Sequence, residues 1–197
     1  MNKRAIFVHG YYGQEKYYDP AADLINFKDY TPWLLKQLTV NDFMVYAPLM
    51  PRPYFPIYAD WKREFERCEP DENTVLVGQS FGGGILVRWL SETDKKVGKV
   101  FLVAPAYYPF ADNELVGKYD ADFFNFSLDR NLVQKTDGLT VFESTNDADN
   151  IKRSYEELVS GIDNLRTITL ENRGHFTTST AGDVNLTFPE LLEEIIK

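Results

Sequence analysis

Short apolar runs alternate with segments of helical periodicity along the whole chain, and this alternation restricts the fold more than any other feature. Six runs, each bounded by turn-forming residues, are predicted to be buried strands: 5–8, 43–47, 74–77, 100–104, 139–143 and 165–170. Helical spacing predicts helices at 32–38, 58–68, 82–90, 151–159 and 188–197. Because strands that alternate with helices pair in parallel through right-handed crossovers, we expect a three-layer α/β domain with a six-stranded parallel sheet and helices on both faces.

Composition favours one domain and argues against several kinds of partner. The 197 residues, 44% of them apolar, can bury a single core, so we expect one domain over 1–197. A net charge of −9 gives no attraction to phosphate backbones or anionic lipids, which argues against nucleic-acid and membrane partners. One cysteine, Cys68, allows no internal disulfide, and with two distant histidines it makes no structural zinc site. The first apolar run is too short for a signal peptide, so we expect a cytoplasmic protein.

Two segments, 14–30 and the aromatic-rich 107–136, do not fit the alternation of strands and helices. Each follows a predicted strand end, and loops at the carboxyl ends of parallel strands surround the usual ligand crevice. We therefore expect both segments to wall a site, with 105–138 forming a partial lid. The alternative is that the aromatic side chains simply pack onto the sheet.

The sequence 78–82, Gly-Gln-Ser-Phe-Gly, stands between a predicted strand and a predicted helix. A turn this sharp forces its central residue, Ser80, into strained backbone geometry, and the glycines at either end remove the Cβ atoms that would collide with it. The serine hydroxyl is then exposed beside the helix N-terminus, whose N–H groups favour a developing oxyanion. A glycine-rich turn that only allows close packing is the alternative, but no dinucleotide or nucleotide fingerprint is present. Ser80 is therefore the predicted nucleophile.

A serine nucleophile needs a base, and the chain has only two histidines, His9 and His175. In hydrolases with this turn the acid and then the histidine follow the serine along the chain, which leaves His175 as the predicted base. The acid that orients it should follow a strand between them, and Asp147 lies just after the run 139–143. Asp149 fits better as a cap of the next helix, but remains the alternative acid.

The second oxyanion donor is expected in the loop after the first strand, where Gly10 and Gly13 allow close approach of the backbone. We expect the backbone N–H groups of Tyr11 and Phe81 to be the two donors, and His9 to be a hydrogen-bonding residue of the turn. With the strand order 2-1-3-4-5-6, strands one and three are neighbours. Both donors would then flank the same crevice at the switch point of the sheet.

These residues resemble the α/β-hydrolases, in particular the small serine hydrolases related to retinoblastoma-binding protein 9. The resemblance spans nearly the whole chain and rests on His9-Gly10, Pro32-Trp33-Leu34, 47–51 with Pro53 and Pro56, Trp61, the Ser80 turn, Ser144 with Asp147, and Gly174-His175-Phe176. It implies the α/β-hydrolase fold, a Ser80, Asp147 and His175 triad, and hydrolysis of small carboxylic esters without a cofactor. Gln79, the loop sequence after Asp147 and the added segment 14–30 depart from the family pattern.

The expected reaction is ester hydrolysis through a Ser80 acyl-enzyme, with no metal or cofactor required. Tyr12 and four later aromatic residues are expected to line the substrate pocket and to favour small apolar acyl or aryl groups: Tyr107, Tyr108, Phe110 and Phe123. Two other functions remain open. The chain could act mainly as a protein-binding module on a hydrolase fold, or as an acyltransferase that uses the same serine.

Overall fold

Six parallel strands form one sheet in the computed structural model, which describes residues 3–108 and 117–197. Their order across the sheet is β2-β1-β3-β4-β5-β6, so the predicted sheet and strand order are confirmed. The strands are β1 (Lys3–Val8), β2 (Phe43–Tyr46), β3 (Thr74–Gln79), β4 (Val100–Val103), β5 (Leu139–Ser144) and β6 (Arg166–Leu170). β1 pairs with β2 on one side and β3 on the other, which makes the gap between β1 and β3 the switch point of the topology.

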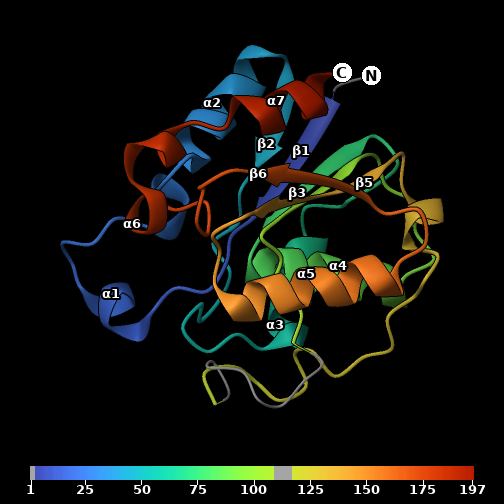
Figure 1. Cartoon of the computed structure of the whole chain (residues 1–197), viewed down its shortest axis with the longest axis horizontal. Coiled ribbons are helices and arrows are strands. Elements are labelled where there is room, and N and C mark those ends of the chain that lie inside the picture. The colour runs from blue at the N-terminus through green and yellow to red at the C-terminus, as the bar shows by residue number, and fades with distance from the viewer. Residues whose placement is uncertain (1–2, 109–116) are drawn as a thin grey trace.

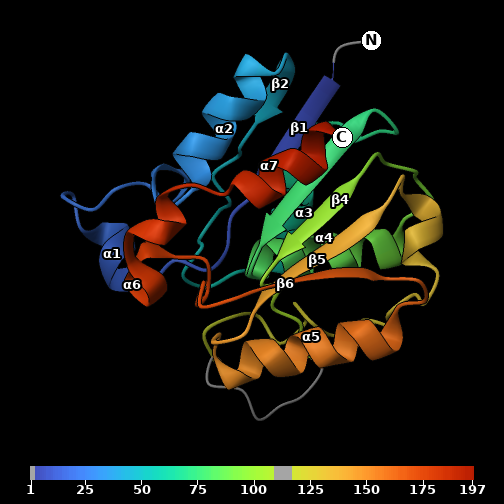
Figure 2. The same cartoon turned by 45° about the horizontal axis from the view of Figure 1, so that its top comes forward.

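Helices cover both faces of the sheet, as expected for a chain of βαβ units (Figures 1 and 2). One face carries α2 (Thr31–Val40) and α7 (Pro189–Ile196). The other carries α3 (Tyr58–Glu66), α4 (Phe81–Glu92) and α5 (Asp149–Gly161). The predicted α/β-hydrolase architecture is therefore present, with the sheet as the middle of three layers.

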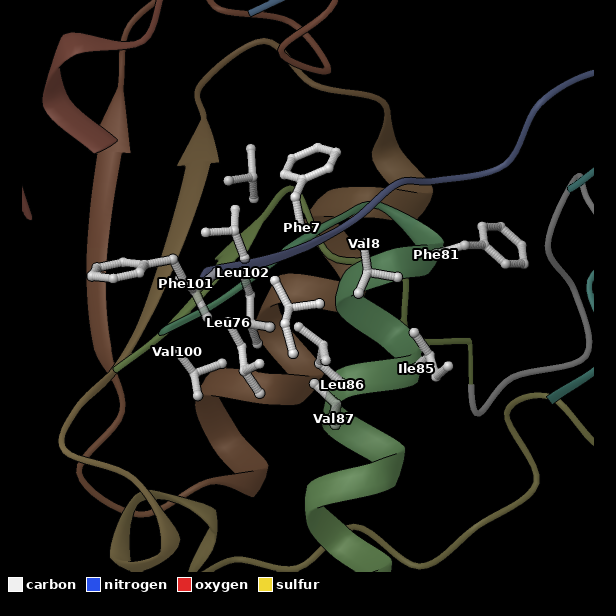
Figure 3. Packing of buried hydrophobic residues seen from close by; sticks show 14 of the residues in the cluster. Phe7, Val8, Leu76, Phe81, Ile85, Leu86, Val87, Val100, Phe101 and Leu102 are labelled. Atoms are coloured by element: carbon white, nitrogen blue, oxygen red, sulfur yellow. The ribbon is translucent and has the colours of Figure 1, made fainter. Parts of the chain in front are cut away.

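The core follows from the alternation of side chains along the central strands. Leu76 of β3 is in register with Val100 of β4, and these residues meet the apolar face of α4, where Ile85 and Leu86 are fully buried (Figure 3). Every residue of β3 and β4 is buried, as expected for central strands covered on both faces. This rigid centre holds the turn at the end of β3.

The structure also contains short elements that helical periodicity could not indicate. They are α1 (Gln14–Tyr18), α6 (Thr178–Ala181) and three 3-10 turns at Ile25–Phe27, Leu132–Lys135 and Gly182–Leu186. Helix α2 begins one residue earlier than expected, so Thr31 is its first residue and Tyr30 is the N-cap. In the ranges that the structure describes, no helix is long and apolar enough to span a bilayer.

Candidate active site

Ser80 stands alone between the end of β3 and the start of α4, in backbone geometry that L-residues rarely adopt. Its φ is 53° and its ψ is −119°. The backbone is held there from both sides, because the Ser80 N–H donates to the Val103 carbonyl and the Ser80 carbonyl accepts from Gly84 and Ala106. Such strain persists only where the surrounding structure fixes it, and it occurs often at functional sites.

Two glycines allow the loop after β1 to lie against this turn. A Cβ on Gly82 would come 2.0 Å from the Val8 carbonyl oxygen. A Cβ on Gly10 would come 2.8 Å from the Ser80 Cβ and 3.4 Å from its Oγ. Neither contact is tolerable for any other residue, so glycine at both positions is what brings the β1 loop to the serine.

Asp147 and His175 lie side by side in the loops after β5 and β6. His175 Nδ1 is 3.0 Å from Oδ2 and 3.1 Å from Oδ1 of Asp147. The carboxylate is 3% exposed and the imidazole 24% exposed. An ionised carboxylate only accepts hydrogen bonds, so His175 Nδ1 is the donor to Asp147 when the carboxylate is charged.

Asp149, the alternative acid, lies elsewhere. It is exposed and is the first residue of α5, where a negative charge near the helix N-terminus is favourable. Asp147 is instead fixed by its own turn, since its N–H donates to the Ser144 carbonyl and its Oδ1 accepts from the Ala148 N–H at 2.7 Å. The structure thus brings Asp147, and not Asp149, to His175.

Hydrogen bonds join the loop that carries Asp147 to the loop that carries His175. Ser144 Oγ accepts from the Arg173 N–H at 2.9 Å, and Asn146 Oδ1 accepts from the Gly174 N–H at 2.7 Å. Ser144 Oγ also donates to Asn146 Oδ1 at 2.9 Å, so these two side chains are bonded to each other as well as to the His175 loop. Sequence reasoning included Ser144 only through family resemblance and missed Asn146 altogether.

Arg173 and Asn185 hold the His175 loop from its other side. Both are buried, and Arg173 Nε donates to Asn185 Oδ1 at 2.8 Å. The Asn185 amide donates back to the carbonyls of Arg173 and Thr177, on either side of His175. The Arg173 guanidinium also lies 4.9 Å from the Phe188 ring, a cation–π contact. The only sequence signal for this network is an arginine two positions before the predicted base.

Ser80 and His175 open onto one cavity of about 100 Å³, at the crevice between β1 and β3. Its walls come mostly from the β1 loop and from the segment that leads into α2: His9, Gly10, Tyr11, Tyr12, Ile25, Lys28, Asp29, Thr31, Gln79, Ser80, His175 and Thr177. Among the described residues, Ser80 Oγ has no hydrogen-bond partner. In enzymes without bound substrate this bond is often long and shortens in the substrate complex.

The backbone N–H groups of Tyr11 and Phe81 are both free to bind a ligand. Phe81 is the first residue of α4, where helix N–H groups lack partners within the helix. Within residues 3–108 and 117–197, neither N–H donates a hydrogen bond. Tyr11 lines the cavity of Ser80, and Phe81 directly follows Ser80 in the chain.

His9 is a buried structural histidine, as expected. It accepts a hydrogen bond from the Met50 N–H at Nε2, 2.8 Å away, and its Nδ1 lies 2.8 Å from the Gly10 carbonyl, to which it donates. Burial lowers the pKa of His9 from 6.5 to about 4. It is therefore neutral near pH 7, with both nitrogens occupied.

Of the five predicted pocket residues, the structure places only Tyr12 at the cavity of Ser80. Tyr108 and Phe123 are buried in an aromatic cluster next to the start of α4, and the buried Tyr107 packs against Phe126. Phe81 is at the centre of this cluster, with ring centroids 6.0 Å from Tyr108 and 5.4 Å from Phe123. Figure 3 shows the Phe81 side chain pointing away from the strands of the sheet. The fifth residue, Phe110, lies outside the described residues.

Arg88 of α4 holds the described part of the predicted lid segment in place. Its guanidinium donates to the carbonyls of Asp122 and Phe123 and pairs with the Asp122 carboxylate at 3.0 Å. The same group lies 3.6 Å from the ring of Tyr58 and pairs with Glu92 at 2.8 Å. These contacts bury the aromatic rings of the segment against α4.

Comparison with known proteins agrees with this geometry. The chain matches the family model described as serine hydrolase over residues 31–183. No curated protein gives a significant match. Similar solved structures include the ydeN gene product of Bacillus subtilis, with 20% identity, coverage of 98% of this chain and 96% of that one, and a TM-score of 0.73.

Two further structures share the fold at lower identity. A serine hydrolase from Cycloclasticus zankles has 13% identity, coverage of 98% and 88%, and a TM-score of 0.64. The carboxylesterase CesB from Bacillus subtilis has 12% identity, coverage of 98% and 81%, and a TM-score of 0.56. Among the described residues, no group of three or more His, Cys, Asp or Glu could hold a metal ion. With its fold, its strained serine and the family match taken together, the chain belongs to the serine hydrolase family.

Proposed function

We propose that this enzyme hydrolyses small carboxylic esters through an acyl-enzyme on Ser80. Ser80 Oγ attacks the ester carbonyl while its proton passes to His175 Nε2. The tetrahedral intermediate collapses, the carbon–oxygen bond to the alcohol breaks, and the imidazolium gives its proton to the leaving alkoxide. Water then attacks the acyl-enzyme, again with His175 as base, and releases the carboxylic acid and free Ser80.

Asp147 and the two free N–H groups have defined parts in this reaction. Asp147 keeps the His175 proton on Nδ1 and stabilises the imidazolium as it forms. The N–H groups of Tyr11 and Phe81 receive the oxyanion, which is more stable there than in water because the donors are fixed in advance. The reaction requires only these side chains, backbone groups and water.

One observation carries the proposal: the contact of buried Asp147 with His175 Nδ1, while His175 and strained Ser80 share a cavity. A pure binding module would not need an acid buried against a histidine that lines the same cavity as a strained serine. The printed description of CesB as a carboxylesterase is consistent with an ester substrate.

The proposal is tested by labelling with a fluorophosphonate probe, which reacts with activated serines. Wild type and Ser160→Ala, an exposed serine of α5, should label fully, whereas Ser80→Ala should not label and His175→Ala should label at least 100-fold more slowly. Circular dichroism confirms that each variant is folded. A folded wild type that does not label, or a Ser80→Ala variant that does, contradicts the proposal.

Two further variants identify the carboxylate that acts with His175. Asp147→Asn should lower kcat for p-nitrophenyl acetate by about 10³–10⁴-fold, because the amide favours the wrong histidine tautomer. Asp149→Asn, two residues away and exposed, is the matched control and should stay within about twofold of wild type. A large loss in Asp149→Asn alone would reassign the acid. Product analysis with added alcohols separates hydrolysis from acyl transfer.

A further inference from the structure

A second, larger cavity of about 410 Å³ adjoins the cavity of Ser80. Three residues, His9, Tyr12 and Ile25, line both. The remaining walls come from the segment after β1 and from the loop after β2: Lys16, Tyr17, Ala22, Asp23, Leu24, Leu49, Met50, Pro51 and Pro53. Its volume lies within the range of small-molecule sites in proteins.

Hydrogen bonds tie both walls of this larger cavity to the β1 loop, so the cavity is formed before any ligand binds. The Tyr12 N–H donates to the Pro53 carbonyl at 3.0 Å, and the Met50 N–H donates to His9. On the opposite wall, the Tyr12 hydroxyl donates to the Asp23 carbonyl at 2.6 Å. A preformed site avoids the entropic cost of ordering a loop around its ligand.

The lining of the larger cavity is mainly apolar. Leucine, isoleucine, methionine, proline and aromatic side chains make up most of it, and its charged groups, Lys16 and Asp23, belong to exposed residues. His9 presents no charge, because burial lowers its pKa to about 4 and both of its nitrogens are already bonded. The cavity therefore suits a hydrocarbon group better than a polar or ionic one.

The position of His175 determines which part of an ester would reach this cavity. The leaving alcohol must lie at His175, since the imidazolium gives its proton to that oxygen. His175 lines only the smaller cavity. His9 and Tyr12 line both cavities, so they mark the side of the smaller cavity that adjoins the larger one. A chain bonded to the carbonyl carbon and directed away from His175 would enter the larger cavity.

We propose that the 410 Å³ cavity is an acyl-chain pocket, and that the enzyme acts on esters of medium-chain fatty acids in preference to acetates. This inference rests on the proposed ester hydrolysis at Ser80. Part of the pocket wall, Lys16 to Ile25, precedes the first residue of the family match, Thr31. The segment 14–30 therefore shapes the proposed pocket together with the loop after β2.

The test is the dependence of kcat/KM on chain length in p-nitrophenyl acetate, butyrate and hexanoate. Each buried methylene is worth up to about fourfold, so hexanoate should exceed acetate by at least tenfold. A second series varies the alcohol of acetate esters from ethyl to hexyl and should show a much smaller rise. A flat acyl series, or a rise in the alcohol series alone, overturns the proposal.

Variants that fill the larger cavity test whether the chain-length preference arises there. Leu24 and Leu49 line only the larger cavity and are 53% and 49% exposed, so tryptophan at either position can be accommodated without disrupting the core. Leu24→Trp and Leu49→Trp should lower the hexanoate-to-acetate ratio of kcat/KM by about tenfold. Val159→Trp, on the exposed side of α5 at 43% exposure, is the matched control and should leave the ratio at the wild-type value.

The outcomes separate this inference from the proposed function. If fluorophosphonate fails to label Ser80, the proposed function fails. If Ser80 labels and acetate is hydrolysed, but Leu24→Trp and Leu49→Trp retain the wild-type ratio, the acyl-chain pocket alone is wrong.

Discussion

The segment after β1 (14–30) and the described part of the segment after β4 (117–136) both follow strand ends, yet they are built in opposite ways. The first exposes most of its large apolar side chains before the buried Tyr30, with Tyr18 63% and Phe27 66% exposed, and it lines both cavities. The second buries its rings, with Phe123 fully buried against Phe81, and is anchored to Arg88. A position after a strand end therefore places a segment near a site, but the contacts that anchor the segment decide whether its side chains line the cavity or pack into the core.

The largest expected contrast between the two segments is in stability. Phe123→Ala removes a ring packed in the aromatic cluster and should lower the free energy of unfolding by about 3–5 kcal/mol. Phe27→Ala, the matched change in the first segment, should lower it by less than about 0.5 kcal/mol. Urea denaturation measures both, and Phe123→Leu gives a milder variant if Phe123→Ala does not fold. Equal losses in the two segments would break the comparison.

The next largest effect concerns His9, which lines both cavities beside the first segment and binds the Met50 N–H of the opposite wall. Its pKa is lowered by burial from 6.5 to about 4, so between these values the unfolded chain binds a proton that the folded protein does not. Acidification through this window should therefore cost about 3 kcal/mol of stability, with no further loss from His9 below pH 4.

Urea denaturation at pH 7 and at pH 4 measures this loss, and His9→Gln should lack it. A direct check is the NMR titration of the His9 ring in the wild-type protein, which should show no transition near pH 6.5. A His9 resonance that titrates at its ordinary pKa would mean that the floor of the two cavities is open to water.

The smallest expected effect distinguishes a loss of order in the first segment from a loss of stability of the whole protein. Tyr12→Phe removes the hydrogen bond from the Tyr12 hydroxyl to the Asp23 carbonyl and should cost about 1 kcal/mol or less. Because that bond holds one wall of the larger cavity, kcat/KM for p-nitrophenyl hexanoate should fall about fivefold, and acetate hydrolysis should fall less. Equal losses for both esters would show that Tyr12 acts at Ser80 and not on the pocket wall.

The sequence predicted the sheet because its strands are apolar runs buried on both faces, and the pattern itself reports this burial. Helix α1 (Gln14–Tyr18) could not be predicted in the same way, since it has no buried residue and hence no periodic apolar side. The strand-turn-helix pattern around Ser80 was similarly informative, because Gly82 is required by the close approach of Val8 and His9, and Gly78 by that of Gly82 and Gly83. In each case, burial or close packing restricts the residue types at these positions, and the sequence pattern shows this restriction.

Parts of the site that depend on tertiary partners could be predicted only with an alternative left open, or not at all. Asp147 and Asp149 differ by two positions, and only the turn from Ser144 decides which carboxylate meets His175. The aromatic residues after β4 were expected at the pocket because a ring suits a substrate as well as a core. The anchor that decided between these roles, Arg88, is 34 residues away from Asp122 in the chain.

The contact of Gly10 with Ser80 has a consequence for how activity appears during folding. The two N–H groups proposed for the oxyanion, on Tyr11 and Phe81, belong to stretches separated by about 70 residues, and they meet only when β1 is paired with β3. The intervening residues, which include β2 and α3, must close as one large loop first, a slow step in chains with many non-local contacts. Recovery of hydrolase activity on refolding should therefore report this central pairing and should not precede it.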